Sequence, residues 1–160
     1  PHFTQMSDPI SLSPEHLAQL NLAPAHSALA HLLAQPSLDY PALRFDIDFP
    51  QAANDPRELS EIPEVRLWFI RLDSRYPWLP LYLDWEAGEL ARYTAMLVPH
   101  QFSPVDGIRY NPEALEIYVM NKVFSVHHWL QSHELDGLKR LQQMTQMLGY
   151  ELDDGLFQLL

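Results

Sequence analysis

The chain has 160 residues, of which 47% are hydrophobic and 19% charged, a balance typical of a globular domain rather than of a disordered segment. A formal net charge of −11 argues against a nucleic-acid-binding surface, which needs clustered Lys and Arg, and against docking on anionic membranes. Because there is no cysteine, a disulfide scaffold, a thiol nucleophile and a thiolate-ligated zinc or iron–sulfur site within this chain are excluded.

The length predicts a single domain over residues 1–160. Pro1 to Gln5 precede Met6, and we interpret them as an expression scar with the native start at Met6. We see no signal peptide and no apolar run long enough to cross a bilayer. These features favour a cytoplasmic protein without stable membrane insertion.

Two helices are predicted near the start of the chain. Ser13-Pro14-Glu15 combines a hydroxyl N-cap with proline at the first helical position, and the short helix that follows should end near Pro24. A second helix is expected from Ala25 to Gln35, where Pro36 stops it. Together they form an N-terminal helical pair.

A strand is predicted from Leu43 to Phe49, because apolar and polar side chains alternate there and one face can be buried. The β-branched and aromatic content of Val65 to Leu72 indicates a second strand. A third is expected from Trp78 to Trp85, although Pro80 restricts it to a sheet edge or a bulge.

The segment Glu86-Ala87-Gly88 has the length and the glycine of a hairpin loop, so Glu89 to Val98 is predicted to be a fourth strand. A helix competes with this interpretation, because Leu90, Tyr93 and Leu97 also fit a 3.6-residue period.

The strongest helix signal begins at Asn111-Pro112-Glu113 and continues to about His133. One wide apolar stripe on this helix is formed by Leu115, Val119, Val123, Val126 and Leu130. A narrower stripe of Ile117, Met120 and Phe124 lies on roughly the opposite side, and we expect another layer of this protein to cover it, with a partner as the alternative. A last helix is predicted from Asp136 to Leu148.

The predicted fold is therefore α+β. An N-terminal helical pair precedes a mainly antiparallel sheet of about four strands, and C-terminal helices cover one face of that sheet.

The sequence gives little support for catalysis. The eight histidines lack metal-ligand spacing, and neither a glycine-rich phosphate loop nor a GxSxG nucleophile motif is present, so we expect no catalytic residues, no metal and no cofactor. The alternative is a small metal-dependent enzyme that uses Asp46, Asp48 and Asp84 to hold magnesium. An ordinary charged strand face explains Asp46 and Asp48 equally simply.

The middle of the chain is rich in aromatic residues and arginine, the side chains enriched at binding hot spots. They fit a core with a charged rim as well as they fit an interface. Tyr76 and Trp78 fall in an expected turn, where they can be partly exposed. The predicted partner-binding residues are Arg57, Glu58, Glu61, Arg66, Arg75, Tyr76, Trp78, Asp84, Trp85 and Arg92.

Several contiguous runs in this region resemble one family. They are Asp55–Asp73 (DPRELSEIPEVRLWFIRLD), Tyr76–Pro80 (YPWLP), Asp84-Trp85, Ala87–Phe102 (AGELARYTAMLVPHQF) and Asn111–Ile117 (NPEALEI). The family is that of the chlororespiratory-reduction-six maturation factors, and the likeness is close from Pro50 to Phe124 and looser in the flanks.

This resemblance implies an assembly factor for the photosynthetic NADH dehydrogenase-like (NDH) complex of chloroplasts and cyanobacteria. The implied partner is the I subunit (NdhI), a ferredoxin-like protein with two [4Fe–4S] clusters in the hydrophilic arm. Because plant members carry a transit peptide and this chain has none, the resemblance implies a cyanobacterial, cytoplasmic binding chaperone rather than an enzyme. It supplies no catalytic residues.

Overall fold

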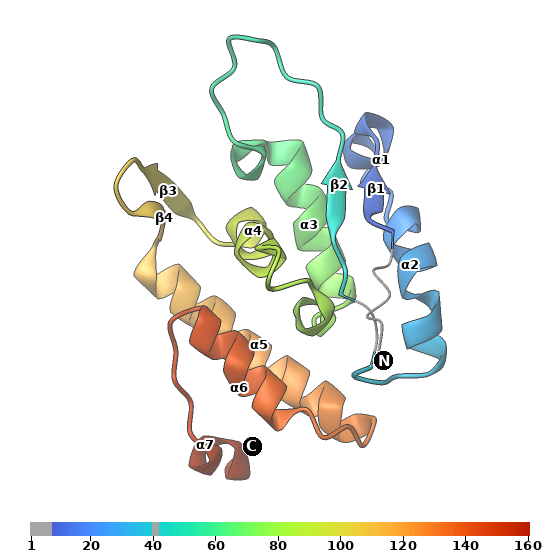
Figure 1. The fold of residues 1–160 in the computed structure, drawn as a ribbon, viewed down its shortest axis with the longest axis vertical. Coiled ribbons are helices and arrows are strands. Elements are labelled where there is room, and N and C mark those ends of the chain that lie inside the picture. Colours follow the sequence, from blue (N-terminus) through green and yellow to red (C-terminus); the bar gives the residue numbers. More distant parts are fainter. Residues whose placement is uncertain (1–7, 40–41) are drawn as a thin grey trace. The chain divides into compact units, whose positions relative to one another are not determined.

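The computed structural model describes residues 8–39 and 42–160, which form two compact units. Unit 1 consists of the described residues up to Tyr76 together with Tyr82–Leu97, and unit 2 consists of Pro77–Leu81 and Val98–Leu160. Pro1 to Gln5 lie outside the described residues. Figure 1 shows the elements in chain order. The single domain stays a prediction.

Unit 1 is mainly helical. Its elements are β1 (Ile10–Leu12), α1 (Pro14–Ala18), α2 (Ala23–Ala34), β2 (Phe45–Ile47), the 3-10 turn η1 (Leu59–Glu61), α3 (Pro63–Arg75) and α4 (Glu89–Leu97). The strands β1 and β2 pair in parallel, with Ile10 opposite Phe45 and Leu12 opposite Ile47. A second 3-10 turn, η2 (Leu79–Tyr82), joins the two units in sequence.

Aromatic rings fill the core of unit 1. Phe45 from β2 lies edge-on to Phe69 of α3 at a centroid distance of 5.0 Å, and Trp68 and Tyr93 complete the cluster. The polar atoms of these rings are satisfied: the Trp68 indole N–H donates to the carbonyl of Asn21 at 2.8 Å, and the Tyr93 hydroxyl donates to a carboxylate of α3. Burial of large rings with paired polar groups stabilises this layer.

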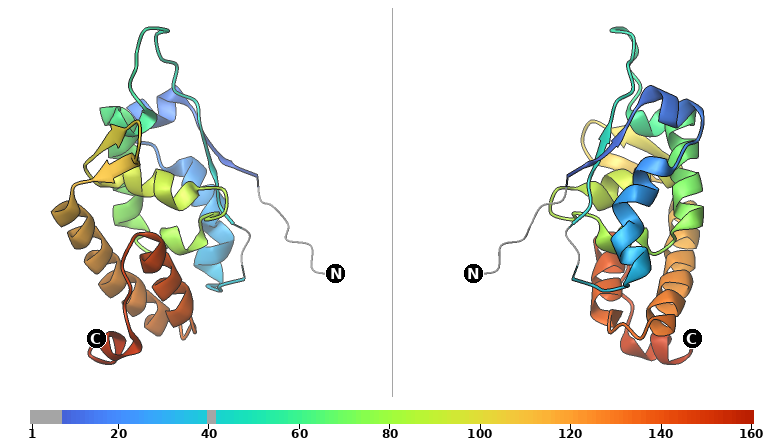
Figure 2. Two further views of the ribbon diagram at one scale, coloured as in Figure 1. Left: turned by 60° about the vertical axis from the view of Figure 1, so that its left-hand side comes forward. Right: turned by 90° about the vertical axis from the view of Figure 1, so that its right-hand side faces the viewer.

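Unit 2 contains a hairpin followed by helices. Its elements are β3 (His100–Ser103), β4 (Gly107–Tyr110), α5 (Pro112–Ser132), α6 (Leu138–Met147) and α7 (Asp154–Gln158). The hairpin is antiparallel, and Gly107 supplies the positive φ of +73° that closes its turn. Helix α6 packs beside α5 in both views of Figure 2.

The predicted helices are confirmed by their caps. The Ser13 hydroxyl accepts the N–H of His16 ahead of α1, and the Asn111 side chain accepts the N–H of Ala114 ahead of α5. Helix α2 begins two residues before the second predicted segment and ends one residue before its end, and α6 lies within the last predicted segment. The first helix was expected to end near Pro24, but α1 ends at Ala18 and Pro24 lies in the first turn of α2. The wide stripe of α5 is the buried one, with Val119, Val123, Val126 and Leu130 in the core of unit 2, while Leu115 at its start is only partly buried.

Three strand predictions were wrong. Residues 65–72 belong to helix α3, where Val65, Trp68 and Leu72 follow a helical spacing and bury one face. Residues 78–85 form η2 and a single bridge between Leu83 and Leu43. Residues 89–97 of the segment predicted as Glu89 to Val98 form α4, the alternative that their 3.6-residue period had indicated.

The predicted sheet is correspondingly wrong, while the α+β class is confirmed. The described residues contain two separate two-stranded sheets, β1–β2 and β3–β4, instead of one sheet of four strands. The strand predicted from Leu43 to Phe49 is reduced to Phe45–Ile47, and its partner is parallel. Three of the four segments predicted as strands are helical or irregular in the structure. Helices therefore supply most of the buried side chains.

Glu89 is a buried carboxylate at the start of α4. Burial raises its pKa above the usual 4.5, and this effect is opposed by the Arg92 guanidinium and by the backbone N–H of Phe45. The Arg92 Nη1 lies 3.5 Å from the Glu89 Oε1 and donates a hydrogen bond to the carbonyl of Phe45 at 2.9 Å. On balance, folding disfavours the charged form of Glu89 relative to its neutral form.

Glu89→Gln is expected to gain stability relative to the wild type as the pH rises. Because the folded-state pKa of Glu89 is raised, its contribution to the free energy of unfolding is fully present below the unfolded-state pKa of 4.5. This contribution is lost as the pH rises through the folded-state pKa. Glutamine has no charge to desolvate, so the difference in unfolding free energy should be constant in acid and should favour the variant at neutral pH. Urea denaturation at several pH values measures it, and a pH-independent difference would contradict this account.

Candidate functional site

The partner-binding residues predicted from the sequence differ widely in exposure. Exposed members are Arg57, Glu58, Glu61 and Arg75, partly exposed ones are Arg66, Asp84, Trp85 and Arg92, and buried ones are Tyr76 and Trp78. Trp78 belongs to unit 2, and the others belong to unit 1. The ten residues therefore do not form one set of surface side chains.

Several of these side chains form internal contacts. The Arg57 guanidinium pairs with Asp55 at 2.8 Å and holds the pKa of that carboxyl well below its usual range. The Arg66 Nε donates to the carbonyl of Met96 at 3.3 Å. Together with the bond from Arg92 to β2, these contacts tie helices and loops of unit 1 together.

The expectation that Tyr76 and Trp78 are partly exposed was wrong, because each is only 5% exposed. Tyr76 caps the C-terminus of α3, and its hydroxyl forms a hydrogen bond with the Nδ1 of His26. The Trp78 ring stacks on Trp129 of α5, with ring centroids 4.8 Å apart and an angle of 18° between the planes. Turn residues with large apolar side chains are buried here because helices offer them packing partners.

The alternative metal site is not assembled. Asp46 and Asp48 are exposed on and beside β2, and the Asp84 Oδ1 accepts the N–H of Ala87 at 3.1 Å in a turn. Across residues 8–39 and 42–160, the structure brings no three His, Cys, Asp or Glu side chains together as a metal-binding group.

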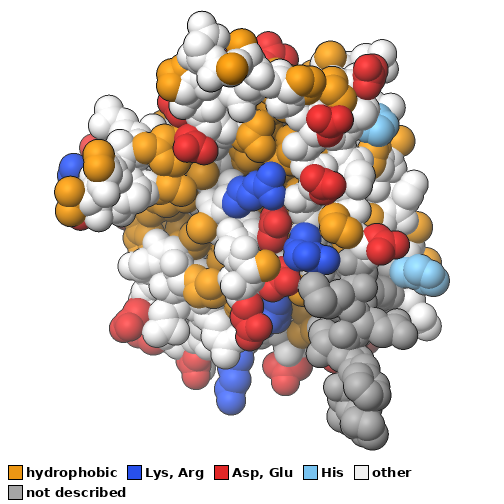
Figure 3. Space-filling model, turned by 45° about the horizontal axis from the view of Figure 1, so that its top comes forward, with side chains coloured by type: hydrophobic (Ala, Val, Ile, Leu, Met, Phe, Trp, Pro, Cys, Tyr) orange, Lys and Arg blue, Asp and Glu red, His pale blue; other side chains and the backbone are white. Residues whose placement is uncertain are grey.

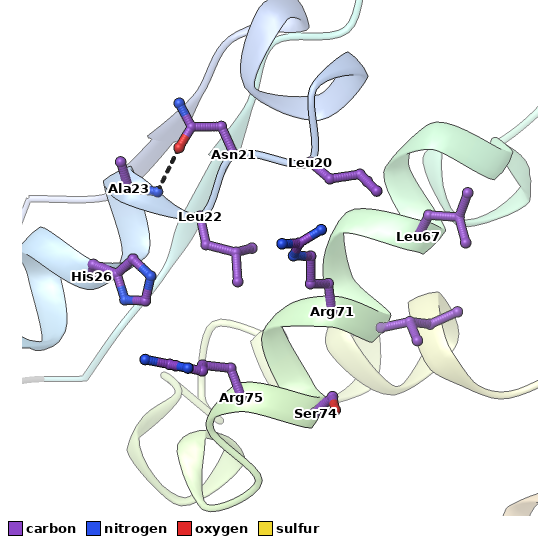
Figure 4. Close-up of a pocket in the computed structure, with 10 residues that line it drawn as sticks. Leu20, Asn21, Leu22, Ala23, His26, Leu67, Arg71, Ser74 and Arg75 are labelled. Carbon is purple, nitrogen blue, oxygen red and sulfur yellow. Dashed lines mark hydrogen bonds between the residues drawn. The ribbon is translucent and has the colours of Figure 1, made fainter.

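Unit 1 carries an open groove. Its volume is about 890 Å³, and its wall comes from the turn between α1 and α2 and from one face of α3. The lining residues are Leu20, Asn21, Leu22, Ala23, His26, Leu67, Ile70, Arg71, Ser74 and Arg75. Figure 4 shows Arg71 and Arg75 extending from α3 toward the α1–α2 segment, with Leu67 farther along α3.

Local geometry shapes both walls of the groove. Leu20 has a positive φ of 51°, which reverses the chain after α1, and the Asn21 side chain accepts the N–H of Ala23 at the start of α2. On α3, the groove residues recur every three or four positions, so one helical face lines the cavity. Of these residues the sequence prediction included only Arg75.

A second open surface lies on unit 2. Ile117 is 63% exposed and Phe124 is 52% exposed, with Met120 partly exposed between them, so residues 8–39 and 42–160 do not supply the covering layer expected over this α5 stripe. Phe102 and Val105 of the hairpin are exposed as well. Apolar side chains gather on the lobe at the left of Figure 3, which the hairpin forms, while acidic and basic side chains lie interspersed over the face drawn.

These surfaces define an α+β protein with an open groove on one unit and an exposed apolar helix face on the other. The family model for chlororespiratory reduction 6 matches residues 12–159, and the chain belongs to this family. The resemblance found in the sequence is thereby confirmed. No solved structure matches the chain.

Family membership implies a role in assembly or maturation of the NDH complex, and the family is one of assembly factors rather than of known enzymes. Among the residues that the structure describes, no helix combines the length and the apolar character that crossing a membrane requires.

Proposed function

We propose that this protein is a chaperone that binds the ferredoxin-like I subunit of the NDH hydrophilic arm during its maturation. The family supports a role in assembly of the complex. The observation that carries the proposal is the exposed apolar face of α5, formed by Ile117, Met120 and Phe124. An immature subunit exposes apolar surface that would otherwise aggregate, and a face of this kind can cover it.

The charges beside this face favour a basic client segment. Glu113 and Glu116 are exposed one turn before Ile117 and Met120 on the same side of α5. The chain as a whole carries a net charge of −11. Acidic groups at the rim of an apolar patch mainly accelerate association with a basic partner and orient it.

Of the residues predicted from the sequence, Glu58 and Glu61 keep this role in the proposal. Both are exposed on unit 1 and are not paired with a basic side chain among the described residues. They would steer basic parts of the client in the same way. Tyr76 and Trp78 are left out of the proposed interface because they are buried.

The protein's contribution to iron–sulfur maturation would be to hold the client's fold rather than to supply cluster ligands. Because the chain has no cysteine, it cannot donate thiolate ligands to the client's clusters. It can hold the client's cluster-binding fold while another source delivers iron and sulfide. This role needs complementary surfaces and no bond-making step.

Phe124→Asp is expected to weaken binding to the purified I subunit by at least about tenfold while leaving the melting temperature nearly unchanged. A charge on the exposed α5 face must be desolvated when the client covers it, but it stays in water in the free protein. Biolayer interferometry on the immobilised I subunit measures the affinity. Mass spectrometry of subunits that co-purify with the tagged protein provides the independent test of the partner's identity.

Leu33→Asp is the matched control, because Leu33 is an exposed leucine on α2 and the substitution changes the charge by the same amount. We expect it to alter the affinity by less than about twofold. Equal binding by the wild type and by Phe124→Asp would exclude the α5 face. Absence of the I subunit from the co-purified material would overturn the proposed partner.

A further inference from the structure

The groove of unit 1 contains two arginine side chains from one face of α3, Arg71 and Arg75. Within residues 8–39 and 42–160, the side chains of Arg71 and Arg75 form neither a hydrogen bond nor an ion pair, and both residues are exposed. Five of the other eight cationic side chains are held by a carboxylate or a backbone carbonyl, and Arg44, Arg109 and Lys139 have no such bond among the described residues. The five held side chains are Arg57, Arg66, Arg92, Lys122 and Arg140. In a chain with a net charge of −11, an unneutralised pair of arginines is a local excess of positive charge.

The spacing of this pair adds to its electrostatic cost. Residues four apart on a helix lie on one face about 6 Å apart along the axis, so Arg71 and Arg75 repel each other on the isolated chain. Both extend toward the α1–α2 segment, across the open part of the groove (Figure 4). An anionic ligand in the groove would neutralise both and remove the repulsion.

The rest of the groove requires an apolar ligand surface. Leu67 is 52% exposed and Ile70 is 43% exposed on the same helix face, and Leu20 lies on the opposite wall. Free carboxylates or phosphates would meet only exposed guanidiniums in water, where such pairs are weak, and would leave these leucine and isoleucine side chains uncovered. A ligand that combines acidic and apolar side chains covers the whole groove.

We propose that the groove binds an acidic amphipathic helical segment of a partner protein. Carboxylates at positions i and i+4 of such a helix match the one-turn spacing of Arg71 and Arg75, and apolar side chains of the same helix pack on Leu20, Leu67 and Ile70. This is recognition of a helix by a groove, with charge pairs setting register. It concerns unit 1 alone and goes beyond the binding of a basic client by α5 of unit 2.

A peptide display experiment tests this directly. Random peptides of about 16 residues, roughly four helical turns, are selected on the full-length protein and then counted for Asp and Glu spacing. Enriched peptides should carry acidic residues one turn apart beside apolar ones. Their affinity, measured by fluorescence anisotropy, should fall at least about tenfold for the Arg71→Gln, Arg75→Gln double variant.

Two matched variants make the result specific. Arg109→Gln removes an exposed arginine from unit 2 and should leave the affinity unchanged within about twofold. Arg71→Lys, Arg75→Lys keeps the charge and should retain most of the binding at low salt. Thermal melts of all variants should agree with the wild type, because the altered side chains are exposed.

Three outcomes would overturn the proposal: no enriched peptide, enriched peptides without paired acidic residues, or equal binding to the double glutamine variant. None of them depends on the I subunit. Failure here therefore leaves the proposed chaperone function intact, and loss of I-subunit binding to α5 leaves the groove proposal intact.

Discussion

Replacing either Tyr76 or Trp78 with alanine is expected to lower the unfolding free energy by about 3–5 kcal/mol, a large part of the stability of a domain. Both side chains are almost completely buried. Truncation of Trp78 removes its stacking on Trp129, and truncation of Tyr76 removes the hydrogen bond to His26. Each leaves a cavity that helices on either side cannot fill without moving.

Denaturation in urea measures these losses. Exposed residues provide the comparison: Leu67→Ala in unit 1 and Phe124→Ala in unit 2 should each change stability by less than about 0.5 kcal/mol. If the Tyr76 and Trp78 variants keep wild-type stability but lose affinity for the I subunit, the two rings belong to an interface after all.

The helices that could be predicted from the sequence are those with local signals. Ser13-Pro14 and Asn111-Pro112 combine a capping side chain with proline at the first helical position, and both functions are performed within one helical turn. Such signals need no information about distant residues. The starts of α1 and α5 and the end of α5 were accordingly predicted to within about a residue, whereas α1 ends at Ala18, six residues before the Pro24 expected to stop it.

Helix α3 shows how composition can mislead. Valine, tryptophan, phenylalanine and isoleucine favour strands, and their density between residues 65 and 70 suggested one. The burial of Val65, Trp68, Phe69 and Leu72 follows spacings of three and four instead. Periodicity was the stronger signal in this segment, and Pro63 at the first helical position supported it.

The two strand pairings differ in whether a local sequence signal predicts them. Asp106-Gly107 is a strong hairpin signal, so β3–β4 could have been predicted. The parallel pairing of β1 with β2 joins residues more than thirty positions apart, and three-residue strands leave almost no pattern. Only the folded chain shows that Phe45 pairs beside Ile10.

The candidate surfaces were predicted only in part, because the sequence does not show which side chains are exposed. Tyr76 and Arg75 are neighbours in sequence, yet one is buried and the other lines the groove. Arg71 was missed because a strand interpretation gives no reason to pair it with Arg75, whereas a helix places the two on one face. The stripe of Ile117, Met120 and Phe124 was identified from its period, but only the structure shows that it is exposed.

The two faces of α5 differ most clearly in burial at the adjacent residues Val123 and Phe124. Val123 is completely buried in the core of unit 2, while the adjacent Phe124 is half exposed. Val119 and Val126 lie on the buried side with Val123, and Leu141 and Met144 of α6 belong to the same core. An aspartate side chain would therefore lie among apolar side chains at position 123 and in water at position 124.

Val123→Asp is expected to unfold unit 2, because a carboxylate placed among these side chains has no basic partner and costs at least several kcal/mol. Far-UV circular dichroism and a thermal melt should show loss of helix at temperatures where the wild type is folded. Phe124→Asp, with the same new charge one residue later, should melt within a few degrees of the wild type, since its carboxylate stays hydrated. A Val123→Asp protein that melts like the wild type would mean that α5 packs through another face, and the exposed stripe proposed for the client would then have to be assigned again.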